Sequence, residues 1–405
     1  MSIVSEKPVV LIFPFELLSH YLRCLQLAST IRDDYDVYFV HSHRYAHVIE
    51  EAGFTTFTCD AFNIDEVMTS ARKFDFSWLN YRTLERIFLS QIKSIKQYQP
   101  VAVLGDTAPT LKMAAEFCQT KYISLMNGYM TKYYKFVRQI SKDHPAAQFQ
   151  NKFPRKIFEL MIETGERATF KKVHRPFKAL RQKYGLRSLS AYLDELEGDC
   201  NLICDLLELF PQKDLPKNYH IIGPLFYSGN EPEEEIRRFL DNDRPSILVN
   251  IGSSGDFEKS AFLSDPYFER YNIVFAGDAN GVLGGKHIVG KTFINNSAIL
   301  DLIDLVICHG GNGSIYQALA FGVPVVCATS IFEQEWNVQG LVQLNLGASL
   351  DGISDLEEIK ALIQKWITRK NSAPFQSIKE KINIASSRQC FQTLFAKTVM
   401  GQIWN

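Results

Sequence analysis

The stretch VICHGGNGSIYQALAFGVPVV, residues 306–326, sets four glycines, a histidine and an asparagine between two apolar runs. DLVIC (304–308) predicts a strand, and SIYQALAF (314–321) has helical spacing, so residues 309–313 form the loop that feeds a helix N-terminus. The backbone N–H groups there lack helical partners and favour an anion, and glycines let such a ligand come close. The stretch therefore predicts an anion site or, as the simpler interpretation, a tight turn before a capped helix.

The residues that follow extend the same edge of the sheet. Gly322 suits the end of the helix, and Pro324 stops it from continuing. VPVVCATS (323–330) predicts the next strand, so IFEQEWN (331–337) lies at the carboxyl edge, where ligands bind in open α/β folds. Glu333 and Gln334 in this loop offer hydrogen-bonding groups that suit a polyol.

Strands and helices alternate along most of the chain, in two series. PVVLIFPF, YDVYFVHS, PVAVLGD and KYISLMN predict strands of the first series, and RPSILVNIGSS, YNIVFAGD, HIVGKTFI and PVVCATS predict strands of the second. Such alternation is typical of parallel βαβ units, so we expect an α/β protein with two halves. The first domain covers 1–220, with a basic, mostly helical insertion at about 131–190, and the second covers 221–385. Residues 386–405 predict a last amphipathic helix, one that could cross back to the N-terminal domain.

The composition is that of an ordinary soluble protein, with 46% hydrophobic and 22% charged residues among 405. No apolar run reaches about 18 residues, and the start MSIVSEKPVVLIF does not have the pattern of a secretory signal. Eight scattered cysteines without a CxxC pair predict reduced, buried thiols. We therefore expect a cytoplasmic protein.

The net charge of −1 conceals a basic segment. Between Lys132 and Arg187, fifteen basic and four acidic residues give +11, so the rest of the chain carries −12. Such a surplus attracts a phosphorylated substrate or acidic lipid headgroups, and no nucleic-acid partner is expected. Aromatic and aliphatic residues lie among these lysines. They indicate either a solvated helical face covered by lysine stems or a peripheral contact with an anionic membrane surface at the inner membrane face.

The run HGGNGSIYQALAFGVPVVCATSIFEQEWN (309–337) resembles the donor signature of the nucleotide-sugar glycosyltransferases of family 1, which include UDP-glycosyltransferases and macrolide glycosyltransferases. The spacing from His309 through Gln334 to Asn337 fits that signature. NIGSS (250–254) is similar to the Gly-Ser loop of the family, and IIGPL (221–225) to its interdomain passage. The resemblance implies the GT-B fold, in which the parallel sheets of two Rossmann-like domains face each other across a cleft.

The resemblance also implies the donor ligands. A nucleoside-diphosphate sugar, linked to UDP or dTDP, is the implied co-substrate, with no other cofactor. Two departures concern the nucleotide, because Phe293 stands where the family has tryptophan and Gln317 where it usually has glutamate. The implied diphosphate ligands are Gly252, Ser253, His309, Gly311, Asn312, Gly313 and Ser314; the nucleoside ligands are Phe293, Ile294 and Gln317; and the donor-sugar ligands are Glu333 and Gln334.

In that family the N-terminal domain takes the acceptor. FELLSHYLRCLQLA is similar to the GHxxPxxxLA stretch of the family, with His20 eight residues before Ala28, and with Ser19 and Arg23 in place of Gly and Pro. VLGDTAPTLKMAAE resembles the segment whose aspartate orients that histidine, which nominates Asp106. Outside this context, a histidine at the start of an apolar helix would more often be structural.

The implied reaction is inverting, metal-independent transfer of a sugar to a hydroxyl of a small-molecule or lipid acceptor, with His20 as general base and Asp106 as its orienting partner. Two alternatives remain: a sugar-nucleotide 2-epimerase of the same fold, and a non-catalytic nucleotide-binding scaffold. Two Asp-x-Asp matches, at 34–36 and 241–243, have a pattern that metal-dependent transferases use. Each lies in a loop ahead of a predicted strand, which favours a solvated turn, so no metal site is expected.

Overall fold

The computed structural model describes residues 7–140, 144–149, 152–229, 232–252, 257–277 and 285–401. The chain divides into two compact units. The first comprises residues 1–225 together with 384–405, and the second comprises residues 226–383. The C-terminal helix α13 (Ile384–Val399) thus belongs to the first unit, where it packs on α1, β5 and β6.

The first unit has a seven-stranded sheet in the order β3-β2-β1-β4-β5-β6-β7, and every pairing in it is parallel. All six residues of β1 and all five of β4 are buried, as expected where helices cover both faces of a parallel sheet. Its strands are β1 (Val9–Pro14), β2 (Asp36–Val40), β3 (Thr55–Phe57), β4 (Ala102–Asp106), β5 (Lys121–Met126), β6 (Cys200–Ile203) and β7 (Tyr219–Ile221). Its helices, besides α13, are α1 (Leu18–Ala28), α2 (Ala46–Glu51), α3 (Ile64–Ala71), α4 (Tyr81–Tyr98), α5 (Leu111–Cys118), α6 (Arg155–Val173) and α7 (Arg175–Lys183), with short 3-10 turns η1 (Gly128–Met130), η2 (Pro145–Phe149) and η3 (Tyr192–Leu196).

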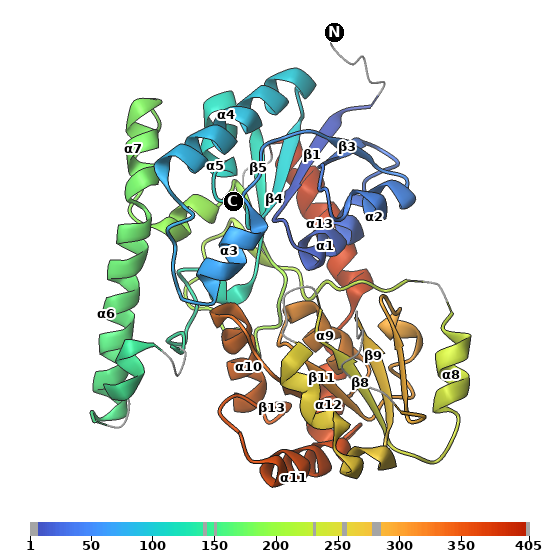
Figure 1. Cartoon of the computed structure of the whole chain (residues 1–405). Helices are drawn as coiled ribbons and strands as arrows, with labels where there is room; N and C mark the ends of the chain where they lie inside the picture. Colours follow the sequence, from blue (N-terminus) through green and yellow to red (C-terminus); the bar gives the residue numbers. More distant parts are fainter. Residues whose placement is uncertain are drawn as a thin grey trace. The chain divides into compact units, whose positions relative to one another are not determined.

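The second unit has a six-stranded, all-parallel sheet in the order β10-β9-β8-β11-β12-β13. The strands are β8 (Ser246–Asn250), β9 (Asn272–Ala276), β10 (Ile288–Lys291), β11 (Leu305–Cys308), β12 (Val325–Cys327) and β13 (Gly347–Ser349). The helices are α8 (Glu234–Leu240), α9 (Asn312–Ala320), α10 (Phe332–Gln343), α11 (Leu356–Ile367) and α12 (Ala373–Lys379), with 3-10 turns η4 (Phe257–Ser264), η5 (Pro266–Arg270) and η6 (Asn296–Ala298). The prediction of two α/β halves with parallel sheets is therefore confirmed (Figure 1).

Strand order decides which loops meet within each unit. In the first sheet β1 pairs with β4, although two strands separate them in the chain, so the loops after β1 and β4 are neighbours. In the second sheet β11 lies between β8 and β12, which brings together the loops that follow these three strands. Such changes in strand order are where open α/β sheets bind ligands.

The basic insertion forms α6 and α7, which run along one side of the first unit (Figure 1). Buried ion pairs fasten it. Arg138 pairs with Glu166 of α6, and Glu195 accepts hydrogen bonds from both His174, at Nε2, and Arg181, at Nε, each at 2.7 Å. No side chain of α6 before Phe170 is buried, so the first part of this helix is held away from the core.

Two predictions about the whole chain can be compared directly with the structure. All eight cysteines are free thiols, as expected, and five of them are buried, whereas Cys59, Cys118 and Cys390 are partly exposed. Among the residues that the structure describes, no helix is both long enough and apolar enough to cross a bilayer.

Candidate functional site

His20 and Asp106 lie in contact in the first unit. Asp106 is the last residue of β4, and His20 lies in the first turn of α1, which follows the neighbouring strand β1. Nδ1 of His20 is 2.9 Å from Oδ1 of Asp106. The carboxylate is fully buried, whereas 15% of the histidine side chain is exposed. The pair therefore combines a shielded anion with an imidazole that a ligand can reach.

Arg23, one turn along α1 from His20, holds the other side of the carboxylate. Its buried guanidinium donates from Nε to Oδ2 of Asp106 at 2.8 Å and from Nη2 to Oδ1. Nη1 donates to Oδ1 of Asn127, whose Nδ2 donates to the Tyr129 hydroxyl at 2.7 Å. Burial alone would raise the pKa of Asp106, but the charge of Arg23, and then that of His20, outweighs burial and lowers it to about 2. Asp106 therefore stays ionised at neutral pH.

In the second unit the glycine loop encloses His309. A Cβ atom at Gly252 would lie 2.6 Å from Cε1 of His309, and one at Gly311 would collide with Nε2. Gly252 and Gly310 also have φ values of 64° and 85°, which side chains other than glycine rarely adopt. The glycines of the two loops are thus needed so that the backbone can close around one imidazole.

His309 is neutral in this position. Burial lowers its pKa to about 4, and Nδ1 lies 3.5 Å from the carbonyl oxygen of Asn250, the last residue of β8. At neutral pH this imidazole offers a hydrogen bond and no charge.

Helix α9 starts without a side-chain cap. Its N-cap residue is Gly311, and the first intrahelical bond joins the amide of Ile315 to the Gly311 carbonyl oxygen at 3.1 Å. The hydroxyl of Ser314 accepts a hydrogen bond from Nδ2 of Asn250 at 3.4 Å. The interpretation as a side-chain-capped helix is therefore wrong. Instead, the amides of Asn312, Gly313 and Ser314 form the positive end of an uncapped helix, beside His309.

The expected nucleoside ligands differ in how available they are. Phe293 is 51% exposed and meets the ring of Tyr227 edge-on at 6.0 Å, whereas Ile294 is buried. Gln317 is also buried, and its amide group is engaged within the unit. Nε2 donates to the Tyr227 carbonyl oxygen and to the Ser297 hydroxyl, each at 2.9 Å, and Oε1 accepts from Asn296 at 3.2 Å. Gln317 thus ties α9 to the segment around η6.

The side chain of Gln334 is likewise engaged, because it bonds to backbone amides at the start of its own helix. Its Oε1 accepts hydrogen bonds from the amides of Ser330 and Ile331, at 2.7 and 3.3 Å, and the side chain is buried. Glu333 beside it is half-buried. Ser253, the remaining expected ligand, lies outside the described residues.

No three His, Cys, Asp or Glu side chains are arranged to hold a metal ion in the described part of the chain. His41 and His43 follow β2, and their rings contact each other. Nδ1 of His41 lies 3.2 Å from the Thr56 hydroxyl, and its ring meets His43 edge-on at 5.3 Å.

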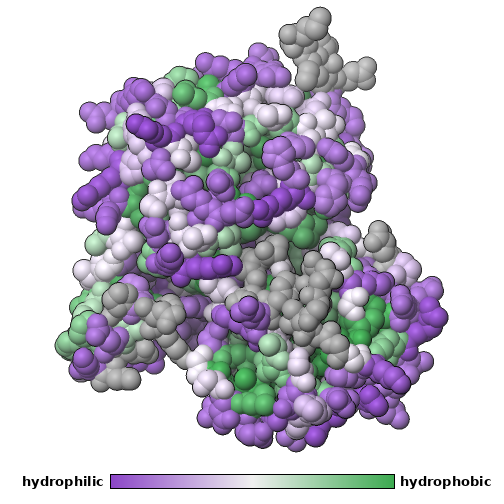
Figure 2. Space-filling model, in the orientation of Figure 1, coloured by the Kyte–Doolittle hydropathy of each residue, from purple (hydrophilic) through white to green (hydrophobic). Residues whose placement is uncertain are grey.

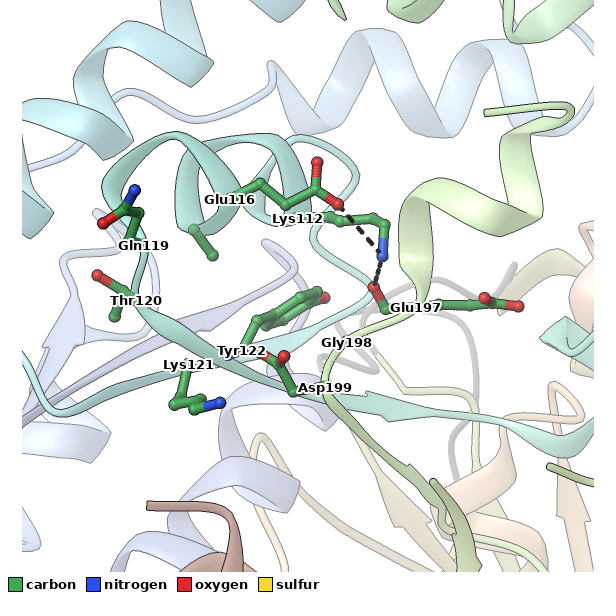
Figure 3. Close-up of a pocket in the computed structure, with 10 residues that line it drawn as sticks. Lys112, Glu116, Gln119, Thr120, Lys121, Tyr122, Glu197, Gly198 and Asp199 are labelled. Atoms are coloured by element: carbon green, nitrogen blue, oxygen red, sulfur yellow. Dashed lines mark hydrogen bonds and ion pairs between the residues drawn. The ribbon is translucent and has the colours of Figure 1, made fainter. Parts of the chain in front are cut away.

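A hollow of about 280 Å³ opens at the end of the first sheet opposite to the end that carries Asp106 (Figure 3). It is lined by the end of α5 and the start of β5, and charged groups of its lining contact each other. Nζ of Lys112 lies 3.6 Å from Glu116 and donates to the carbonyl oxygen of Glu197 at 2.8 Å. Because β5 runs parallel to β4, this hollow lies at the end of the sheet away from Asp106 and is not part of the His20 site.

Two of these functional neighbours were missed from the sequence. Arg23 was noted only as a departure from a family pattern, although its spacing of three residues from His20 places both on one helix face. Asn127 directly follows the buried strand β5, which is the position where an α/β sheet presents polar groups to ligands.

Sequence comparisons find similarity to known glycosyltransferases. Residues 246–392 match the model of the glycosyltransferase family 28 C-terminal domain. The chain is 26% identical over 345 residues to a PGL/p-HBAD biosynthesis glycosyltransferase of Mycobacterium tuberculosis. This match covers 82% of the chain and 78% of the relative.

Solved structures show the same architecture along nearly the whole chain. The glycotransferase of kitacinnamycin has a TM-score of 0.71 at 15% identity, over 97% of this chain and 100% of its own. A Streptomyces glycosyltransferase complexed with thymidine diphosphate has a TM-score of 0.63 at 13% identity, over 96% and 99%. The predicted GT-B fold, with two Rossmann-like domains, is confirmed.

Proposed function

We propose that this chain, a glycosyltransferase of the GT-B type, moves a sugar from a nucleoside-diphosphate sugar to an acceptor hydroxyl, with inversion at the anomeric carbon and without a metal ion. The observation that carries the proposal is the 2.9 Å contact between His20 and the buried Asp106. The nucleotide is UDP or dTDP, in line with the thymidine diphosphate bound by a structural neighbour.

His20 is the general base of this reaction. The 2.9 Å contact between Nδ1 and the ionised Asp106 favours the tautomer that is protonated at Nδ1, which leaves the lone pair of Nε2 to accept a proton. As the acceptor oxygen bonds to the anomeric carbon, its proton passes to Nε2, and the bond between that carbon and the diphosphate oxygen breaks. Asp106 keeps the imidazole oriented while it takes up the proton.

The start of α9 receives the negative charge of the departing diphosphate. The amides of Gly311, Asn312, Gly313 and Ser314, with the neutral imidazole of His309, are fixed donors that need no reorganisation when charge develops. Gly252 and Ser253 are assigned to the same diphosphate, as the resemblance of NIGSS to the Gly-Ser loop of the family implies. Because backbone amides and the helix dipole supply this stabilisation, we expect transfer to continue in the presence of a chelator.

The nucleoside and sugar occupy the flanks of this anion site. The exposed ring of Phe293 serves as the stacking surface for the base, with the buried Ile294 supporting the loop behind it. Glu333 binds donor-sugar hydroxyls, and Gln334 contributes by fixing the start of α10.

The test is transfer by His20→Ala and by a matched control, His43→Ala, which alters an exposed histidine of the same unit. Each is incubated with UDP- and dTDP-sugars and a panel of hydroxylated acceptors, and products are read by mass spectrometry. We expect His20→Ala to lose on the order of 10²–10⁴ in rate, as general-base removal does, with unchanged nucleotide affinity by calorimetry.

The alternatives give different results in the same experiment. Unchanged transfer by His20→Ala overturns the assignment of the base. An epimeric donor formed without acceptor identifies an epimerase, and nucleotide binding without any product identifies a scaffold.

For the acceptor, we propose that the enzyme works at an anionic membrane surface through α6. Ile157, Leu160 and Met161 lie on one helix face at i, i+3 and i+4 and are 49%, 62% and 42% exposed. Phe153, just before the helix, is 41% exposed. Figure 2 shows hydrophobic atoms among hydrophilic ones on the side of the first unit where Figure 1 draws α6.

The positive charge near this apolar stripe favours an anionic lipid surface as its binding partner. Part of the surplus of +11 is neutralised inside the unit, since Lys132, Arg181 and Lys183 pair with acidic side chains outside the segment. Lys152 and Lys156 are exposed beside the stripe, and Lys171 and Lys172 are exposed in the last turn of the same helix. An apolar stripe bordered by lysines is the pattern of a helix that lies in a membrane interface.

A further inference from the structure

Arg23 is bonded to the carboxylate that contacts His20, and the proposed reaction gives this arginine no role. A histidine base usually relies on an aspartate alone, which both orients the imidazole and stabilises its charged form. Here the carboxylate of Asp106 is shared, because Oδ1 faces both Nδ1 of His20 and Nη2 of Arg23, while Oδ2 accepts from Nε of Arg23. The guanidinium is buried and permanently charged.

We propose that Arg23 is a positioning residue that sets the basicity of His20 by neutralising Asp106. The bidentate ion pair has no net charge, so Asp106 still orients the imidazole through Oδ1 but adds little preference for the imidazolium. Arg23 thus takes from His20 the stabilisation that an unpaired carboxylate would give to the imidazolium. This inference deepens the proposed function and rests on His20 being the base.

The surroundings of the pair are consistent with this arrangement. Cys24 and Cys204 lie near Arg23, and burial raises the pKa of each thiol, so both stay uncharged at neutral pH. Thr107 contacts Oδ1 of Asp106 at 3.4 Å, and Asn127 and Tyr129 are neutral groups on the far side of Arg23. The remaining acids nearby are bound elsewhere: Glu16 accepts from Ser42 and Tyr21, and Asp205 accepts from the amide of Gly128 at 2.6 Å.

The geometry of Arg23 is itself held in place. Its third donor, Nη1, bonds to Asn127, whose own amide bonds to the Tyr129 hydroxyl, so the guanidinium plane is fixed on both sides. A lysine at this position would retain the charge but could not form the two parallel bonds to the carboxylate.

The experiment follows the imidazole of His20 by NMR through a pH titration, in the full chain without ligands, with His20→Gln to assign the signal. In Arg23→Gln, loss of the positive charge raises the midpoint of protonation by about one pH unit or more, because Asp106 is then uncompensated. Arg23→Lys keeps the charge and shifts the midpoint by less than half as much. The acidic limb of kcat/KM moves with the midpoint, which a purely structural arginine would not cause.

A double variant covers the case in which Arg23→Gln does not fold. Arg23→Met with Asp106→Leu replaces the ion pair by apolar groups, a change that buried pairs often tolerate. If the pair is neutral in effect, the midpoint of His20 stays within about half a pH unit of that of the wild type. A drop of a full unit or more would overturn the inference, and so would an unchanged midpoint in folded Arg23→Gln.

These outcomes are separate from those that test the reaction. The titration measures coupling between His20 and Arg23 whether or not sugar is transferred. Failure of transfer to depend on His20 would remove the catalytic meaning of the coupling and leave the measured shift intact.

Discussion

The side-chain amide of Asn337 donates a hydrogen bond from Nδ2 to the carbonyl oxygen of Gly310, 2.9 Å away. Asn337 lies on α10 and is buried, and Gly310 lies in the loop before α9. Two parts of the sequence signature that are 27 residues apart are therefore joined by one bond. The bond fixes the loop whose amides we assign to the diphosphate.

Replacing Asn337 by leucine tests this support. Asn337→Leu leaves the Gly310 carbonyl oxygen buried without its donor, which should lower the free energy of unfolding by about 1–3 kcal/mol. Nucleotide affinity, measured by calorimetry, should fall as well, because the loop is no longer held. Gln343→Leu, at an exposed position of the same helix, is the control and should change neither quantity. Unaltered nucleotide binding by Asn337→Leu would show that the loop does not need this bond.

Gly311 and Gly313 offer a sharper comparison within the loop itself. A Cβ at Gly311 meets the imidazole of His309, whereas one at Gly313 has no atom within 4 Å. Gly311→Ala should therefore destabilise the free protein by about 1–3 kcal/mol through overpacking, and Gly313→Ala should not. If the diphosphate lies over the start of α9, Gly313→Ala still weakens nucleotide binding, because the methyl group enters the space of the ligand. Full affinity in Gly313→Ala would place the phosphates elsewhere.

The sequence carried the fold far because the pattern of each strand is local. Within PVVLIFPF and DLVIC, every residue of β1 and β11 is buried, and the glycines between strand and helix mark the turn that the structure contains. Contacts across the sheet are different, since they depend on strand order. The pairing of β1 with β4 brings Asp106 to His20, and only the family resemblance pointed to it.

Side-chain engagement was beyond the reach of the sequence. Gln317 and Gln334 occupy positions of the donor signature, yet the amide of each is bonded inside the second unit. In the sequence, Arg23 is only a substitution for the proline of the family pattern, whereas in the structure it bonds to Asp106. Both outcomes depend on where neighbouring backbone groups lie, and residue spacing along one chain does not contain that information.

Gln317→Glu should not improve nucleotide binding, although glutamate is the usual residue of the family at this position. A carboxylate cannot donate to the Tyr227 carbonyl oxygen, which accepts from Nε2 at 2.9 Å, and it would be charged in a buried site. We expect a loss of about 1–3 kcal/mol in the free energy of unfolding, with equal or weaker affinity for UDP and dTDP. Gln343→Glu makes the same chemical change at an exposed position and serves as the control. Tighter nucleotide binding by Gln317→Glu would mean that the side chain turns to the ribose.

The buried His309 predicts a dependence of stability on pH. Its pKa falls from 6.5 to about 4 on folding, so between these values the unfolded chain binds a proton that the folded chain does not. Stability is therefore highest above about pH 6.5 and falls by about 3 kcal/mol as the pH drops to about 4. Denaturant titrations of wild type and His309→Gln at several pH values measure this, since the variant lacks that part of the slope. Equal slopes in the two proteins would show that His309 takes up a proton in the folded state.

The apolar stripe of α6 predicts membrane binding that depends on both lipid charge and Leu160. Leu160 is 62% exposed, and burying a leucine in the lipid interface contributes about 1.5–3 kcal/mol, so Leu160→Glu should weaken binding to vesicles with anionic lipid by at least about tenfold. Gln182→Glu, at an exposed position of α7, adds the same charge without removing apolar surface and should have a much smaller effect. Co-sedimentation at low and high salt separates the two contributions, because screening weakens the attraction of the lysines and leaves the apolar contact. Binding that is insensitive to salt, or equal in Leu160→Glu and wild type, would contradict a membrane role. A change of mass in solution by light scattering, lost in Leu160→Glu, would instead assign the stripe to a second copy of the chain.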